Sequence, residues 1–236
     1  MYKYSELVHN TEAAEVVLPI LFSIIDKPES VLDVGCGIGT WLHVFKNQGV
    51  QEVFGIDGDY VDGEMLSKYI DQNEFQALDL EKSFDLDKKF DLVISLEVAE
   101  HLNEYTAHIF VDSICRHSDI ILFSAAIPGQ GGQNHINEQW PEYWARIFQK
   151  HGYVFLDPIR PLIWEDSRVD FWYRQNIFLV VKEEHLLSKR FPVSHKALVH
   201  PELLGKLVES YGKQLDILNK RLEIHPLKRW IKLLIS

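Results

Sequence analysis

The segment VLDVGCGIGT, residues 31–40, decides the fold of this chain. A run of aliphatic residues ends in Gly35, Gly37 and Gly39, and a segment that can form a helix follows directly. Glycines at this point allow a tight turn and a close approach of the backbone to a ligand at the helix N-terminus. A dinucleotide fingerprint requires G-x-G-x-x-G, whereas the spacing here is G-x-G-x-G. Asp33, two residues before the first glycine, also disfavours a pyrophosphate at this turn.

Beyond this segment, short β-branched runs alternate with helical patterns, which is typical of a parallel sheet with crossover helices. The sequence therefore predicts an α/β fold. The predicted strands lie at residues 30–35, 52–57, 75–80, 90–96, 119–125, 152–158 and 176–182.

Helices are predicted between these strands from their ends and their apolar faces. One covers residues 41–47, a second follows Asn103 as its capping residue, and a third covers 141–150. Ahead of the first strand, the apolar stretch 13–25 predicts a helix that packs on the sheet, with Pro19 kinking or splitting it.

Length and composition indicate a globular protein. The chain has 236 residues, 46% of them hydrophobic, which is enough for one large domain and an appendage. It has no run of eighteen apolar residues and no layout typical of a secretion signal, which predicts a cytoplasmic location. The two cysteines, Cys36 and Cys115, form neither a disulfide framework nor a CxxC zinc motif.

Charge is distributed unevenly along the chain. Residues 1–181 carry 13 Lys and Arg against 29 Asp and Glu, whereas residues 182–236 carry 11 against 6. A protein that binds nucleic acid needs a basic face to neutralise phosphates, so the acidic body argues against nucleic acid as the main ligand. The basic tail could contact something anionic.

The glycine loop and the acidic residues that end the next two strands, Asp57 and Asp79, resemble class I S-adenosylmethionine-dependent methyltransferases over residues 30–182. The resemblance implies a Rossmann-like seven-stranded sheet, mostly parallel with an antiparallel last strand, flanked by helices and followed by a C-terminal helical tail. It implies a methyltransferase domain at 1–182, of which 1–29 is a helical cover, and a basic helical extension at 183–236. S-adenosylmethionine would be the cofactor and S-adenosylhomocysteine the product.

The resemblance also implies which residues hold this cofactor. Asp33 and the glycine loop would hold its amino-acid end, Asp57 its ribose hydroxyls, and the residues after the third strand its adenine. An Asp at a strand end can also be a simple turn former, and Glu81 could replace Asp79. The predicted cofactor residues are Asp33, Gly35, Gly37, Gly39, Asp57, Gly58, Asp79, Leu80 and Glu97.

The fourth strand ends in the string LEVAEHL, residues 96–102, which the resemblance places beside the methyl group and the acceptor. A histidine there can remove a proton, because its unperturbed pKa is about 6.5. His101 is therefore a candidate catalytic residue. The alternative is that His101, with Glu97 and Glu100, only shapes the site.

A loop rich in glycine and polar residues, 126–140, follows the fifth strand and should cover the acceptor side of the pocket. His135 is the predicted general base, since burial in a core is not expected in such a loop. Planar amides and aromatic faces are the groups that recognise sugars. Asn137 could instead cap a helix, and the nearby tryptophans Trp140 and Trp144 could pack in the core. The predicted acceptor-binding residues in and beside this loop are Asn134, Asn137, Glu138 and Trp140.

A second set of candidates lies between the sixth and seventh strands. Arg160, Arg168 and Arg174 could hold a phosphate or carboxylate of the acceptor, and Tyr173 adds an aromatic face. The same arginines could instead pair with the acidic residues of that segment. Arg168 and Tyr173 are the predicted acceptor-binding residues here.

These observations predict an O-methyltransferase that acts on a hydroxyl of a small polar acceptor. The stretch NHINEQWPEYW, residues 134–144, resembles a subgroup of small bacterial methyltransferases linked to sugars and surface polysaccharides. The acceptor could instead be an amine, a carboxylate or a phosphoramidate oxygen, or the protein could be a non-catalytic scaffold. No compact carboxylate cluster in the sequence predicts a metal site.

The tail has its own pattern. Apolar residues recur at alternating spacings of four and three over 200–222, which predicts a helix that contacts either its own body or a second copy. Residues 225–236, HPLKRWIKLLIS, form a basic amphipathic segment that resembles a peripheral membrane anchor. A subunit contact is the alternative for this segment.

Overall fold

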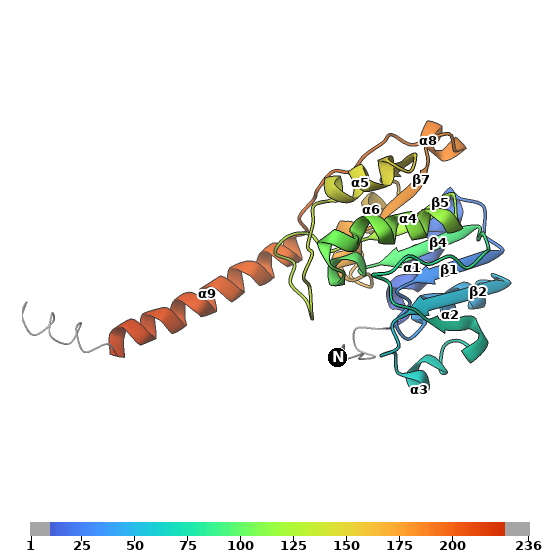
Figure 1. Cartoon of the computed structure of the whole chain (residues 1–236). Coiled ribbons are helices and arrows are strands. Elements are labelled where there is room, and N and C mark those ends of the chain that lie inside the picture. The colour runs from blue at the N-terminus through green and yellow to red at the C-terminus, as the bar shows by residue number, and fades with distance from the viewer. Residues whose placement is uncertain (1–9, 225–236) are drawn as a thin grey trace, which may run out of the picture. The chain divides into compact units, whose positions relative to one another are not determined.

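A computed structural model describes residues 10–224 of the chain, and Figure 1 shows its helices and strands. The chain divides into two compact units, Met1–Leu198 and Val199–Ser236. The predicted membrane-anchor segment 225–236 lies outside the described residues.

The first unit is built on one seven-stranded sheet with the strand order β3-β2-β1-β4-β5-β7-β6. Every pair among β1 to β5 is parallel, while β7 is antiparallel to both of its neighbours, β5 and β6 (Figure 1). The predicted fold class is therefore confirmed, including the antiparallel last strand. The strands are β1 (Ser30–Val34), β2 (Glu52–Asp57), β3 (Phe75–Ala77), β4 (Leu92–Leu96), β5 (Ile120–Ser124), β6 (Tyr153–Leu156) and β7 (Phe178–Lys182).

Helices cover both faces of this sheet, because alternate residues of each strand point to opposite sides. In β1, Val31 belongs to the apolar core beneath α1 and α2, whereas Leu32 belongs to the core beneath α4 and α5. Trp144 of α5 is fully buried, so the core-packing alternative holds for it. The helices of this unit are α1 (Glu12–Ile24), α2 (Thr40–Asn47), α3 (Gly63–Leu66), α4 (Ala107–His117), α5 (Pro141–Gln149), α6 (Arg160–Ile163), α7 (Phe171–Asn176) and α8 (Leu186–Arg190).

Two details of the predicted helices are wrong. Helix α1 runs unbroken through Pro19, so of the two predicted effects the split is wrong and the kink stays a prediction. Pro19 lies on the exposed side of the helix, where water can bind the carbonyl group that a proline leaves without a partner. Asn103 does not cap a helix with its side chain. Its amide donates instead to Glu81 in the segment after β3, and α4 begins only at Ala107, after a short 3₁₀ turn.

The second unit contains α9 (Pro201–Ile224), so the predicted tail helix is confirmed. The apolar residues Leu204, Val208, Tyr211, Leu215 and Leu218 share one side of this helix by their spacing. A single helix cannot bury such a side by itself. Within residues 10–224, no helix is both long enough and apolar enough to cross a membrane.

Candidate functional site

A cavity of about 1050 Å³ opens where the carboxyl ends of β1, β2 and β4 meet. Open α/β sheets bind ligands at this edge, and the volume suits a cofactor together with a small acceptor. Twelve of the predicted site residues line it. They are Asp33, Gly35, Gly37, Asp57, Gly58, Asp79, Leu80, Glu97, His101, Asn134, His135 and Tyr173.

The glycine loop between β1 and α2 forms one wall of the cavity. Gly35, Gly37 and Gly39 have φ angles of 87°, 54° and 85°, which residues with a Cβ adopt at a cost. A Cβ at Gly35 would also lie 2.3 Å from the side chain of Val98. Gly39 does not line the cavity but occupies the N-cap position of α2, so the loop delivers the helix N-terminus to the site.

Asp57, at the end of β2, organises this wall. Its carboxylate accepts hydrogen bonds from the backbone N–H of Gly37 at 2.7 Å, the backbone N–H of Gly58 at 2.6 Å and the hydroxyl of Tyr60 at 2.9 Å. These three bonds join the loops that follow β1 and β2. The carboxylate is therefore held in one orientation at the cavity wall.

Asp33 lies in the same wall and is almost fully buried. Burial, and then the negative charge of Asp57, raises the pKa of Asp33 well above its usual value. A positively charged ligand group would offset both effects. This is the environment expected for a carboxyl that meets the ammonium group of an amino acid.

The segment after β3 supplies the next part of the cavity. Leu80 is buried, whereas Asp79 is half exposed and pairs with Lys82 at 3.0 Å, which lowers its pKa. Glu81, the alternative to Asp79, also lines the cavity and accepts a hydrogen bond from the backbone N–H of Asn103 at 2.8 Å.

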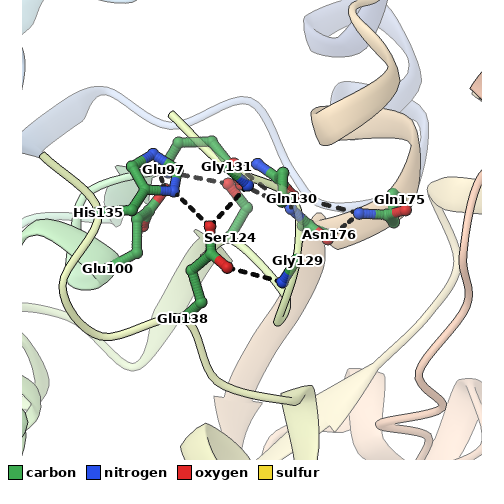
Figure 2. Close-up of polar contacts among 10 residues, drawn as sticks. All are labelled: Glu97, Glu100, Ser124, Gly129, Gln130, Gly131, His135, Glu138, Gln175 and Asn176. Atoms are coloured by element: carbon green, nitrogen blue, oxygen red, sulfur yellow. Dashed lines mark hydrogen bonds and ion pairs between the residues drawn. The ribbon is translucent and has the colours of Figure 1, made fainter. Parts of the chain in front are cut away.

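Glu97 follows β4 and has a φ angle of 56°, a strained value for a residue with a side chain. Its carboxylate accepts hydrogen bonds from Gln130 at 2.7 Å and from Asn176 at 3.1 Å (Figure 2). Burial raises its pKa, and these bonds partly oppose the rise. Sequence reasoning missed Gln130 and Asn176, because nothing in the sequence shows that the loop after β5 and helix α7 meet at β4.

His135 adjoins the residues that follow Glu97. Its Nδ1 lies 2.9 Å from a carboxylate oxygen of Glu138, and its Nε2 faces Glu100 at 4.0 Å (Figure 2). The rings of His101 and His135 meet edge to face, with centroids 4.8 Å apart. Burial, and then His135, lowers the pKa of His101 to about 4, so His101 is neutral near pH 7. Both predicted catalytic histidines are thus in contact.

The loop that carries His135 is held by its own residues. Besides His135, the Glu138 carboxylate binds the backbone N–H groups of Gly129 and Gly131, both at 2.7 Å. The two residues after His135, Ile136 and Asn137, donate backbone hydrogen bonds to the carbonyl of Glu100 at 2.9 and 3.0 Å. These bonds place His135 beside Glu100.

Four of the predicted acceptor-binding residues do not line the cavity. Asn137 is buried and accepts a hydrogen bond from Gln139; it caps no helix, since Trp140 occupies the N-cap position of α5. Trp140 is 43% exposed. Glu138 binds His135 and the backbone of its own loop instead of forming part of the cavity wall.

Arg168 is the fourth, and its guanidinium pairs with Asp166 on the surface at 2.6 Å. The other two arginines of this segment are buried. Arg160 binds Asp157 through two nitrogens, at 2.9 and 2.6 Å, and Arg174 donates to the carbonyl of Trp164. The alternative of a solvated pair with an acidic residue of the segment therefore holds for Arg168, whereas Arg160 forms a buried pair with Asp157, a residue outside that set.

Aromatic rings complete the cavity wall. Tyr173 lies edge to face with Trp41 at a centroid distance of 5.4 Å, and Trp172 is the next ring along. Sequence reasoning included Tyr173 and its neighbour Trp172 but missed Trp41. The place of Trp41 directly after the glycine loop was an available signal.

A strand, a glycine loop and successive acidic strand ends around one large cavity define a class I S-adenosylmethionine-dependent methyltransferase. The residues present fit its cofactor, since the glycine backbone leaves room for a close approach and a buried carboxyl with a raised pKa suits a cationic group. The sequence model of a family described as "Methyltransferase domain" matches residues 7–157, which is more than half of the chain. The chain belongs to this family, and its cofactor is S-adenosylmethionine.

Solved structures share the fold. A sugar N-methyltransferase (KedS8) from Streptoalloteichus matches with 14% identity and a TM-score of 0.57 over 77% of this chain and 96% of that chain. The magnesium protoporphyrin IX methyltransferase of Synechocystis, with bound S-adenosylmethionine, matches with 20% identity and a TM-score of 0.54 over 75% and 80%. The methyltransferase domain of bacterial CtHen1 matches with 19% identity and a TM-score of 0.52 over 73% and 97%. A search of the curated proteins finds no match.

Proposed function

We propose that this protein transfers a methyl group from S-adenosylmethionine to a hydroxyl of a small polar acceptor. The acceptor is a sugar, a nucleotide sugar or a surface-polysaccharide precursor. The observation that carries the proposal is that His101 and His135 line the same cavity as the glycine loop. A site that only binds the cofactor does not need two histidines in contact at that wall.

The cofactor residues of this proposal each match one part of the ligand. Asp33 meets the ammonium group, Asp57 the ribose hydroxyls, and Leu80 with Asp79 the adenine. The cofactor supplies a methyl group made electrophilic by its sulfonium. The protein aligns the attacking oxygen with that group, and such positioning can account for roughly 7 to 11 kcal/mol of the barrier.

His135 is the catalytic residue of the proposal. Its partner Glu138 is a carboxylate and can only accept, so Nδ1 carries the proton and Nε2 has a free lone pair. An Nε2 lone pair at the cavity wall can act on the hydroxyl of the acceptor. Assistance of this kind is worth about 10²- to 10⁴-fold in rate.

The cavity wall supports a carbohydrate acceptor. It presents aromatic faces from Trp41, Trp172 and Tyr173 and amide groups from Gln130 and Asn134. Aromatic faces pack on the CH-rich side of a sugar ring, and amides bind its hydroxyls. An acceptor of this kind agrees with the predicted cytoplasmic location, which forms part of the proposal.

Transfer to an amine is the second candidate, and the sugar N-methyltransferase among the structural neighbours favours including it. The predicted contact of residues 225–236 with a membrane, and the predicted homodimer, are kept as proposals about the tail. Neither affects the chemistry of the cavity.

Two measurements test the proposal in sequence. Calorimetric titration with S-adenosylmethionine and S-adenosylhomocysteine should give micromolar binding of both. A screen for S-adenosylhomocysteine release over nucleotide sugars, amino sugars and polysaccharide precursors should then give turnover, with the product showing an O-methyl signal by NMR. An N-methyl product would establish the second candidate, and cofactor binding without turnover on any acceptor would favour a non-catalytic scaffold.

A further inference from the structure

Three side chains outside the cofactor half of the cavity converge on one point. One possible ligand atom from each of Glu100, His101 and His135 lies within 4.8 Å of the other two. All three residues line the cavity. Figure 2 shows Glu100 and His135 facing each other across this point.

The carboxylate of Glu100 is the group that this arrangement leaves unexplained. The residue is 0% exposed, and within residues 10–224 neither carboxylate oxygen meets a partner at full hydrogen-bond geometry. Burial raises its pKa well above its usual value, and the backbone N–H groups of Glu100 and Ala126 lower that pKa only in part. A buried carboxylate without partners costs several kcal/mol unless a proton or a cation compensates it. Its position at the cavity wall lets a bound cation do so.

We propose that Glu100, His101 and His135 bind a divalent transition-metal ion on the acceptor side of the cavity. Two imidazoles and one carboxylate favour ions such as Mn²⁺, Fe²⁺, Co²⁺ or Zn²⁺ over Mg²⁺ and Ca²⁺, which prefer oxygen ligands alone. The inference rests on the proposed function only for the purpose of the ion, since binding itself depends on these side chains alone.

The orientation of His135 supports this assignment. When the ring is neutral and Nδ1 donates to Glu138, the lone pair of Nε2 faces Glu100 Oε1 across 4.0 Å. With Glu100 ionised, both atoms are acceptors and repel unless a proton or a metal ion lies between them. A histidine held by a carboxylate on its far nitrogen is also the usual arrangement for a metal ligand.

The spacing of the three groups requires a modest closure. Ligand atoms about 2.1 Å from a metal ion lie roughly 3 to 3.5 Å apart, so the cluster must contract by somewhat more than an ångström. The movement has to come from side-chain rotation, because Glu138 holds the backbone of the His135 loop at Gly129 and Gly131.

The surroundings of the cluster favour a cation over an anion. Glu97 is buried nearby, and its charge is one reason why the pKa of Glu100 is raised, after burial itself. Glu97 is already bound by Gln130 and Asn176, so it adds negative potential without being a ligand. A proton or a metal ion bound between these side chains could balance the two carboxylates, and the three potential ligand atoms of the cluster suit a metal ion.

An ion at this position would deepen the proposed function. With the ion bound, the Nε2 lone pair of His135 would hold the ion instead of acting directly on the acceptor hydroxyl, and the ion would lower the pKa of that hydroxyl so that its proton passes to solvent. The oxygen forms its bond to the methyl carbon as the carbon–sulfur bond breaks, so the electron pair of that bond leaves with sulfur.

The test uses the tag-free full chain, from which metal ions have been removed with EDTA and dialysis. One titration adds Mn²⁺ and detects binding by electron paramagnetic resonance. A second adds Co²⁺ and detects binding by visible absorption. The expected result is saturable binding close to one equivalent, with Co²⁺ bands that report nitrogen ligands. Glu100→Gln keeps the volume and removes the charge, and His135→Gln removes one imidazole. Each should weaken binding at least tenfold. Glu104→Gln, the same change at an exposed residue of the same segment outside the cavity, should bind like the wild type.

Absence of binding to the wild-type chain, or equal binding by the wild type and both variants, would overturn the proposal. Thermal melting with S-adenosylhomocysteine shows whether each variant is folded, so that a loss of metal binding is not mistaken for unfolding. A chain that binds metal but methylates no hydroxyl retains the site and contradicts the proposed function. A chain that methylates hydroxyls at full rate after EDTA treatment supports the proposed function and contradicts the part of the inference that gives the ion a role in the reaction.

Discussion

The imidazole of His135 packs against the backbone of Gly132 so closely that a Cβ on Gly132 would lie 2.1 Å from Nε2. Contacts of that length do not occur, so the histidine can occupy its place only because residue 132 has no side chain. The φ angle of Gly132 is not positive, unlike those of Gly129 and Gly131. Close packing, rather than backbone conformation, therefore requires this glycine.

Gly132→Ala should displace the His135 ring without straining the backbone. We expect turnover to fall by about 10- to 10⁴-fold, the range that a positioned histidine contributes, with unchanged affinity for S-adenosylhomocysteine. Steady-state kinetics and calorimetry measure the two effects. Gly63→Ala, where a Cβ meets nothing within 4 Å, is the control. Wild-type turnover in Gly132→Ala would mean that His135 has no part in the reaction.

Asp57→Ala should weaken cofactor binding. The carboxylate holds the N–H groups of Gly37 and Gly58 and is placed to meet the ribose, so we expect a loss of about 1 to 3 kcal/mol, roughly 5- to 150-fold in Kd. Calorimetry with S-adenosylhomocysteine gives the value. Asp119→Ala, which removes a surface carboxylate paired with Lys89, should bind normally. Equal affinity of Asp57→Ala and the wild type would exclude this residue from the site.

Cofactor binding should release protons from Asp33. Burial and the charge of Asp57 raise the pKa of this carboxyl in the free protein, and the ammonium group of the ligand should lower it. Affinity is therefore expected to rise with pH until the pH exceeds the raised pKa. Burial also raises the pKa of the neighbouring Cys36, which stays a thiol and contributes no proton.

Calorimetry in two buffers of different ionisation enthalpy, from about pH 5 to about pH 8, detects this release. Asp33→Asn should bind with the same heat in both buffers. If the wild-type chain also shows no buffer dependence over the whole range, Asp33 is already ionised without ligand.

Arg160→Met should destabilise the fold without touching the cavity. Arg160 is 0% exposed and binds Asp157 through two nitrogens. The central carbon of its guanidinium lies 4.0 Å from the ring centroid of Phe178. Removing one partner of a buried ion pair costs about 3 to 5 kcal/mol, because it leaves the other charge uncompensated. Urea unfolding measures the loss. Arg168→Met, at the exposed pair with Asp166, should unfold like the wild type, and similar values for both variants would contradict this account.

Most of the sheet could be predicted from local patterns, because a buried strand needs a run of apolar residues whichever strand it pairs with. The third strand is shorter than predicted, since β3 ends at Ala77 and the following residues form the cavity wall. The failure of Asn103 to cap a helix could not be predicted, because Glu81, which binds its side chain instead, belongs to a different segment of the chain. Errors of this kind arise wherever a polar side chain has two possible partners.

The cofactor half of the site was the predictable half. Its residues lie at the ends of strands that are consecutive in the sequence. Because parallel strands bring their carboxyl ends to one edge of the sheet, the positions of Asp33 and Asp57 in the sequence already predict that the two residues lie close together. For the acceptor half, the sequence indicated residues of suitable chemistry but not which other residues they contact. Trp140 and Arg168, chosen for their chemistry, lie away from the cavity, whereas Gln130 and Asn176 bind Glu97.

The sequence by itself determined the fold class, the glycine loop and the cofactor, because each depends on residues that are close along the chain. Only the tertiary structure decided that His135 stands beside Glu100 and His101. That meeting depends on two backbone hydrogen bonds from Ile136 and Asn137 to the carbonyl of Glu100. Every non-proline residue carries the same backbone N–H and C=O groups. The sequence therefore does not indicate which carbonyl a distant N–H binds.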